Sequence, residues 1–208
     1  MQKINKSDEP AELTLWKSSN PQKKYSNLTP TERCAIRLAC AQEQCFLCAY
    51  CCKAISGEKS DTMNEHVEAQ SIAQNRTLDF NNIVASCTTK NQCDSAHGSQ
   101  PLPITPLMDE CETEFKFNIN GRVEGLTERA KETIKVLNLG DHEKNNKRLV
   151  SQRKFLFYTI LSTNNFPIGE RIEDEELLKI LMIDLKETRD GKLAPFAPVI
   201  AKMLESWL

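Results

Sequence analysis

A long apolar run is the first feature that the chain lacks. No stretch of its 208 residues approaches the roughly 18 consecutive apolar residues that a membrane-spanning helix needs. The opening residues, Met1 to Ile4, also lack the apolar core that is typical of a secretory leader. We therefore expect a soluble, cytoplasmic protein that has no membrane partner.

A strong excess of charge of one sign is likewise missing. The formal net charge is -2, which gives no global attraction for nucleic acid, so any such binding must come from a local patch. Two interpretations stay open for one basic cluster in the C-terminal half, contact with a phosphate backbone or solubility of a helix face. This cluster consists of Lys144, Lys147, Arg148, Arg153 and Lys154.

Cysteine, in contrast, is plentiful. An odd number of cysteines, nine, with CxxC spacing indicates metal binding rather than disulfides in a reducing compartment. Four thiolates, those of Cys48, Cys51, Cys87 and Cys93, can hold one structural Zn²⁺ tetrahedrally and stiffen the loops that carry them. The second pair is wider than CxxC, so Cys45 or Cys52 stays open as a substitute ligand.

Histidine is scarce, and two of the three histidines lie inside or just beyond this cysteine frame. Hydrolysis of a phosphodiester needs an activated water, charge stabilisation on the phosphate and help for the leaving oxygen. His66 suits the general base, and Glu65 and Asp94 suit the ligands of a divalent cation. Asp94 and His97 would share one face of a short helix. Asn82 would orient the His66 ring or fix the loop between them.

Local signals predict the surrounding elements. Thr29 can cap a helix that runs to about Gln44, with Pro30 at its first position and Glu32 returning a hydrogen bond to the cap. Asn120-Gly121 predicts a hairpin turn. The other expected elements are short strands at 53–55, 63–67 and 82–86, a short helix that carries Asp94 and His97, and helices from about residue 126.

Three regions follow from this pattern. Residues 1–28 are polar and aperiodic, which predicts an extended arm with an apolar anchor around Leu13 and Trp16. Residues 29–125 form the metal-framed module, and residues 126–208 form a helical C-terminal region.

The order of these motifs resembles that of the HNH endonuclease family. The motifs are Cys48-x-x-Cys51, Glu65-His66, Asn82, Cys87 and Cys93-Asp94-x-x-His97. Further motifs resemble the PtuB-like nucleases of Septu anti-phage systems, which also occur beside retron reverse transcriptases. These are Pro103-Ile-Thr-Pro106-Leu-Met-Asp109, Phe115-x-Phe117 with Asn120-Gly121, and Ala130-x-x-x-Ile134-x-x-Leu137-Asn138-Leu139. The similarity covers about residues 30–150.

The resemblance implies an α+β fold: a ββα-metal module framed by a four-cysteine zinc knuckle, followed by a mainly α-helical region. It implies a metal-dependent endonuclease that uses structural Zn²⁺ and catalytic Mg²⁺ or Mn²⁺ to cut DNA, or RNA such as tRNA. It also implies a toxic effector of anti-phage defence that works with a PtuA-like ABC/SMC-type ATPase. In retron-linked versions the partners include a reverse transcriptase and its RNA–DNA hybrid.

The chain departs from the common HNH pattern at the last two positions. Asp94 stands where the family usually has Asn or His, and His97 stands where it usually has Lys. Asp94 remains a good ligand for Mg²⁺. His97 could contact phosphate, bind the cation, or have a structural or zinc-bound role. Two further alternatives remain: a non-catalytic zinc-knuckle adaptor that binds nucleic acid or the ATPase, and a regulatory subunit that acts through its helical half.

Overall fold

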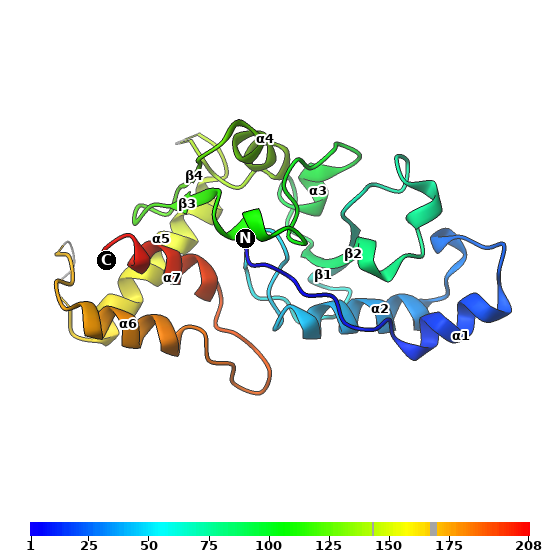
Figure 1. Cartoon of the computed structure of the whole chain (residues 1–208), viewed down its shortest axis with the longest axis horizontal. Coiled ribbons are helices and arrows are strands. Elements are labelled where there is room, and N and C mark those ends of the chain that lie inside the picture. The colour runs from blue at the N-terminus through cyan, green and yellow to red at the C-terminus, as the bar shows by residue number, and fades with distance from the viewer. Residues whose placement is uncertain (143, 167–169) are drawn as a thin grey trace.

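Helices account for most of the regular secondary structure, and two small sheets lie among them. The computed structural model describes residues 1–142, 144–166 and 170–208, and Figure 1 shows the arrangement. The helices of these ranges are α1 (Ala11–Ser19), α2 (Pro30–Glu43), α3 (Asp94–His97), α4 (Glu128–Leu137), α5 (Lys147–Thr163), α6 (Glu175–Asp184) and α7 (Ala197–Glu205). The strands are β1 (Thr62–His66), β2 (Ile83–Cys87), β3 (Phe115–Phe117) and β4 (Val123–Gly125). The predicted α+β class is confirmed.

Helix α2 begins where its sequence signal predicts. The backbone N–H of Thr29 donates to Oε2 of Glu32 over 2.8 Å, and the Thr29 hydroxyl accepts from the N–H of Thr31. Pro30 occupies the first helical position, where its missing N–H costs no hydrogen bond. The buried face of α2, which includes Ile36 and Cys40, packs against β1 and β2.

Strands β1 and β2 form an antiparallel pair that carries the candidate site residues. Thr62 pairs with Cys87 at one end, and His66 pairs with Ile83 at the other. All five residues of β2 are buried. The strand predicted at 53–55 is wrong: it contributes only an isolated bridge between Leu47 and Ala54.

The hairpin at residues 115–125 is also confirmed. Strands β3 and β4 are antiparallel, and Gly121 in the turn between them has a φ of +88°. A Cβ atom at this position would lie 2.1 Å from the carbonyl oxygen of Val150, at the start of α5. Only glycine permits this conformation and this close approach of the two backbones.

The N-terminal region is not the extended arm that its polar sequence predicts. It contains helix α1 and a 3₁₀ turn at Tyr25–Asn27. Helix α1 has little amphipathic character, since it buries only Leu13, so the pattern of its sequence gives a weak helix signal. Pro10 precedes it in extended geometry, and Glu12 and Lys17 suit the two ends of the helix dipole.

The C-terminal helices and the segment before α7 pack on the hairpin and on residues 45–52, which form the first cysteine loop. Helix α7 contacts β3, α5 and α6. The backbone N–H groups of Leu193 and Phe196 donate to the carbonyl oxygens of Cys45 and Cys52, over 3.0 and 2.8 Å. Buried side chains on both sides of residue 126 belong to one hydrophobic cluster. Within the described ranges, none of the helices combines the length and the apolar character needed to cross a bilayer.

Candidate metal centre and active site

Four buried cysteine side chains converge where the first cysteine loop meets the end of β2. The Sγ atoms of Cys48, Cys51, Cys87 and Cys93 all lie within 4.8 Å of one another. A tetrahedral Zn²⁺ with Zn–S bonds of about 2.3 Å requires sulfur–sulfur separations of roughly 3.8 Å, which only a small contraction would reach. The cluster can therefore hold a structural metal such as zinc.

The backbone shapes this cluster before any metal binds. The N–H of Cys48 donates to the carbonyl of Lys53 over 2.8 Å, which closes the first loop. Cys93 adopts a φ of +53° immediately before α3 and so turns its side chain toward the other three. Cys45 and Cys52 also have positive φ values but lie outside the four-sulfur cluster. The structure thus gathers the four cysteines that the motif spacing pairs, without either substitute.

Polar groups around the sulfur atoms favour the thiolate forms that a metal needs. The backbone N–H of Cys87 donates to Sγ of Cys48 over 3.3 Å, and the Gln92 amide donates to Sγ of Cys51 over 3.3 Å. Asn146, the cap of α5, fixes that amide by donating to Oε1 of Gln92 over 2.7 Å. Hydrogen bonds with Cys48 and the other two thiols hold the pKa of Cys87 well below its usual value. Hydrogen bonds with Cys48 and Cys87 raise the pKa of Cys51, and burial raises that of Cys93, so a bound metal has to displace protons from these two thiols.

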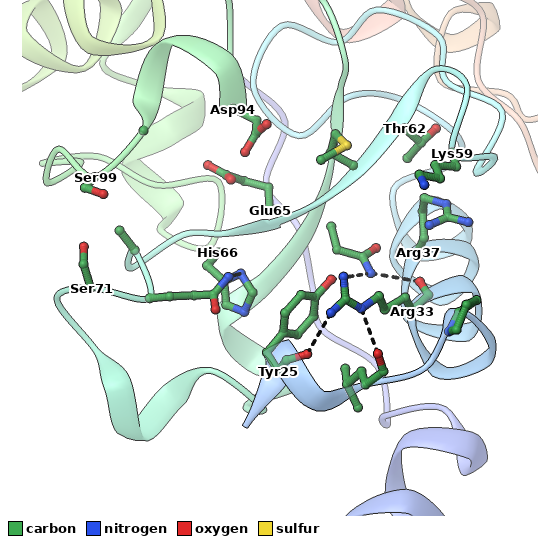
Figure 2. A pocket seen from close by; sticks show the side chains of 17 residues that line it. Tyr25, Arg33, Arg37, Lys59, Thr62, Glu65, His66, Ser71, Asp94 and Ser99 are labelled. Carbon is green, nitrogen blue, oxygen red and sulfur yellow. Dashed lines mark hydrogen bonds between the residues drawn. The ribbon is translucent and has the colours of Figure 1, made fainter. Parts of the chain in front are cut away.

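Next to the cysteine cluster, two carboxyl groups face each other across the gap between β1 and α3. Figure 2 shows the side chain of Asp94 pointing at that of Glu65. Burial, and then the neighbouring Glu65, raises the pKa of Asp94 to about 8. Burial also raises the pKa of Glu65. Two such oxygens pointing at one spot suit a hard divalent cation, which would relieve their repulsion.

His97 supports Glu65 from the protein interior. Its Nδ1 lies 2.5 Å from Oε1 of Glu65, and its Nε2 donates to the carbonyl oxygen of Gln100 over 2.6 Å. The hydroxyl of Tyr50 donates to the same Glu65 oxygen over 3.0 Å. The His97 side chain is fully buried, and burial lowers its pKa. Of the roles left open for His97, this geometry favours the structural one, since both ring nitrogens are engaged within the protein.

The His66 ring is held in one orientation. Its Nε2 lies 2.9 Å from the carbonyl oxygen of Thr77, which can only accept, so Nε2 carries the proton and Nδ1 keeps its lone pair. Nδ1 accepts from the Gln70 amide over 3.3 Å. The Tyr25 ring packs edge-on against the imidazole, with 4.7 Å between centroids. Burial lowers the pKa of His66, which keeps the ring neutral and basic.

Asn82 fixes the loop between the two strands and makes no hydrogen bond to His66 in the described structure. Its Oδ1 accepts from the N–H of Glu68 over 2.8 Å, and its amide donates to the carbonyl oxygens of Glu68 and Arg76 over 3.0 and 3.4 Å. Of the two roles expected for Asn82, the structure therefore favours the one that holds the loop.

A cleft of about 780 Å³ opens onto these groups. Glu65, His66 and Asp94 line it, while Arg33 and Arg37 of α2 line it from the other side (Figure 2). The sequence motifs do not include these two arginines, although their spacing of four on a predicted helix places them on one face. Nor do the motifs include Tyr50, Gln70, Thr77 and Gln92, whose contacts depend on tertiary structure alone.

No protein-family model matches the chain, and no curated protein matches it significantly. The chemistry of the site therefore rests on its own geometry: a cysteine cluster for a structural metal, a pair of facing carboxyl groups, and a neutral imidazole that lines the same cleft.

Proposed function

We propose that the chain is a metal-dependent HNH endonuclease that hydrolyses phosphodiester bonds in nucleic acid. Strands β1 and β2 with helix α3 would be its ββα-metal module, and the cysteine cluster would be its zinc frame. The observation that carries the proposal is that Glu65, His66 and Asp94 line one cleft directly beside that cluster.

In this proposal, His66 is the general base. Its Nδ1 lone pair takes a proton from a water that replaces the long Gln70 hydrogen bond of 3.3 Å, while Nε2–H remains bonded to Thr77 and stabilises the resulting imidazolium. Contact with Tyr25 keeps the ring from rotating during the transfer. A divalent cation such as Mg²⁺ or Mn²⁺, held by Glu65 and Asp94, would stabilise charge on the phosphate and on the leaving oxygen. His97 and Tyr50 orient the Glu65 carboxylate by hydrogen bonds.

The biological role that we propose rests on the sequence motifs. The enzyme would be the toxic effector of an anti-phage complex with a PtuA-like ATPase, and a retron reverse transcriptase with its RNA–DNA hybrid would be a further partner. Its substrate would be DNA, or RNA such as tRNA, because an external water attacks either backbone without help from a 2′-hydroxyl.

One observation favours a second candidate, a non-catalytic zinc-knuckle adaptor. Glu65 already accepts a hydrogen bond from Tyr50 and lies against Nδ1 of His97, so its carboxyl group has partners without a cation. Asp94 argues against the adaptor. Its carboxyl group points at that of Glu65, an arrangement that an adaptor does not need and that costs electrostatic energy unless a proton or a cation is shared.

Brief chelation separates the two candidates. The chain, alone and coexpressed with its ATPase, is exposed to EDTA long enough to strip Mg²⁺ but not zinc, then assayed on plasmid DNA, single-stranded DNA and tRNA. We expect cleavage to stop, to return with added Mn²⁺ or Mg²⁺, and the zinc content to stay constant by elemental analysis. Binding without cleavage under every condition would instead support the adaptor.

A matched substitution sharpens this experiment. Asp94→Asn keeps the size of the side chain but removes the charge that would hold the cation. We expect it to lower cleavage by about 100-fold or more at fixed Mg²⁺, while zinc content and thermal stability remain those of the parent. Unchanged cleavage by Asp94→Asn would remove Asp94 from the cation site.

A further inference from the structure

Two arginines of α2 lie one helical turn apart on the wall of the cleft that faces Glu65 and Asp94. Arg33 and Arg37 have the spacing that places side chains on the same helix face, with about 6 Å between their attachment points. Lys59, in the loop before β1, continues the row, and Figure 2 shows all three on one side of the pocket. The cleft thus has a basic wall opposite its acidic and imidazole groups.

Each arginine is anchored by backbone carbonyl groups and still has N–H groups to offer. Nε of Arg33 donates to the carbonyl oxygen of Leu28 over 3.1 Å, and its Nη2 donates to those of Tyr25 and Ser26 over 3.4 and 3.1 Å, so Nη1 remains for a ligand. Nε of Arg37 donates to the carbonyl oxygen of Gly57 over 2.8 Å. In the described part of the chain, no carboxylate forms an ion pair with Arg33, Arg37 or Lys59. These cations are therefore held in place without being neutralised, as a site that binds an external anion requires.

The ring of Tyr25 lies between Arg33, in the basic wall, and His66, the proposed base. Cζ of Arg33 is 5.2 Å from the centroid of the Tyr25 ring, and that ring packs edge-on against His66. A phosphate bound at Arg33 would therefore be a close neighbour, along a strand, of a phosphate placed at His66. The stack of Arg33, Tyr25 and His66 fixes how far the phosphate-binding groups are from the reacting bond.

We propose that Arg33, Arg37 and Lys59 bind the phosphates that flank the scissile bond of a nucleic-acid strand lying along α2. The inference rests on the proposed nuclease function and assigns the residues that position its substrate. Because these groups would bind phosphate oxygens, they give affinity and register without a preference for base sequence. They also supply the local basic patch that a chain of net charge -2 needs in order to bind a polyanion.

Binding is measured separately from cleavage. All variants carry His66→Ala so that the probe stays intact, and the probe is a 5′-fluorescein single-stranded DNA of mixed sequence. We expect Arg33→Gln/Arg37→Gln to raise the Kd at least tenfold, since each arginine would donate charged hydrogen bonds to the strand. The slope of log K against log salt should fall by about 0.7 for each phosphate that is no longer neutralised.

The matched control is Lys131→Gln/Lys135→Gln on α4. It removes the same charge at the same helical spacing, and neither lysine lines the cleft. We expect this pair to retain the parental Kd and salt slope. Equal effects of the two double variants would overturn the proposal, because binding would then depend on net charge alone. Arg37→Lys keeps the charge and must keep the salt slope, which separates the removal of a phosphate-binding cation from a folding defect.

The failure of this inference can be told apart from the failure of the proposed function. If the chain with His66 intact never cleaves but its binding needs Arg33 and Arg37, the nuclease proposal fails and the binding site stands. If the arginine double variant cleaves with unchanged KM, the binding site fails and the nuclease proposal stands.

A different observation, on α5, carries a second inference. Arg153 is fully buried, although its sequence neighbourhood predicts a surface cluster. Its Nη1 donates to the carbonyl oxygen of Leu139 over 2.7 Å and its Cζ lies 5.2 Å from the centroid of the Phe117 ring, while Nε and Nη2 have no hydrogen-bond partner in the described structure. A buried guanidinium that lacks a counter-charge is strongly destabilising, so this one calls for an anion nearby.

The cysteine cluster supplies such an anion once metal is bound. Four thiolates around Zn²⁺ carry a net charge of -2. The backbone N–H of Cys93 donates to the carbonyl oxygen of Leu137, and Arg153 donates to the carbonyl oxygen of Leu139, two residues further along the chain. The zinc ligand Cys93 and the Arg153 guanidinium therefore contact the same short segment. We infer that Arg153 is the buried counter-cation of the metal-loaded cluster. This inference is independent of any nuclease activity.

Zinc affinity tests this role directly. We expect Arg153→Met to weaken zinc binding by about 10- to 100-fold in competition with a chromophoric chelator, the range typical of groups that surround metal ligands. Arg153→Lys, which keeps the charge, should recover part of the loss and serves if the methionine variant does not fold. Lys154→Met, at the exposed neighbouring position, is the control and should bind zinc as the parent does. Parental zinc affinity in both Arg153 variants would overturn the inference.

Discussion

Replacing His66 by alanine is expected to abolish cleavage while the protein still folds, holds zinc and binds nucleic acid. A positioned general base contributes about 10²- to 10⁴-fold to a rate, and the loss should fall in kcat rather than in KM. No other imidazole described in the cleft can replace it, because His97 is fully buried and both of its nitrogens are engaged.

The surroundings of His66 explain why the effect should be large. Thr77 fixes the tautomer that keeps a lone pair on Nδ1, and Tyr25 restricts the ring from the side. Burial lowers the pKa of His66, so the ring is in its basic form at neutral pH. The alanine variant loses the lone pair and its fixed orientation together.

The control is the third histidine of the chain. His142 is exposed and lies outside the cleft, so His142→Ala should leave kcat, zinc content and unfolding temperature unchanged. Rates are compared on the substrate that the parent cuts fastest, together with circular dichroism and elemental analysis. Parental kcat in His66→Ala would show that another group activates the water.

Local sequence signals predicted those parts of the fold that depend on local interactions. The cap at Thr29 and the turn at Gly121 each combine neighbouring residues whose backbone geometry is constrained, and both are confirmed. Helix α1 was missed because it buries a single leucine, so periodicity gives almost no signal. The segment at 53–55 has strand-like composition, but positive φ at Cys52 turns the chain away from an extended path.

The candidate site likewise combines residues that sequence motifs identify with contacts that only the packing of the chain creates. Motif spacing selected the four cysteines and the Glu65-His66 pair, because metal ligands and their neighbours recur at fixed separations. The support of Glu65 by His97 could not be predicted, since it depends on how a helix packs against a strand more than thirty residues earlier. Arg153 shows the same limit in reverse: its charge predicts exposure, while the structure buries it.

Replacing Cys48 by serine should destabilise the whole metal-framed module. The free energy of binding a structural zinc is folding free energy, and a serine hydroxyl is a poor substitute for a thiolate. A loss of about 4 kcal/mol would lower Tm by roughly 10 °C in a chain of this size. Zinc content should fall below one ion per chain. Cys34→Ser is the matched control, because Cys34 is an exposed free thiol outside the cluster.

The cleavage activity of Cys48→Ser should fall together with its zinc content, because the cysteine cluster also positions Asp94. Cys93 directly precedes Asp94, and the N–H of Asp94 donates to the Ser86 hydroxyl, which lies 3.7 Å from Sγ of Cys48. Loosening Cys48 therefore loosens the start of α3 and the carboxyl group that faces Glu65. Calorimetry, zinc analysis and cleavage are measured on the same samples. A Cys48→Ser protein with the zinc content, Tm and kcat of Cys34→Ser would show that the cluster neither binds a structural metal nor supports the cleft.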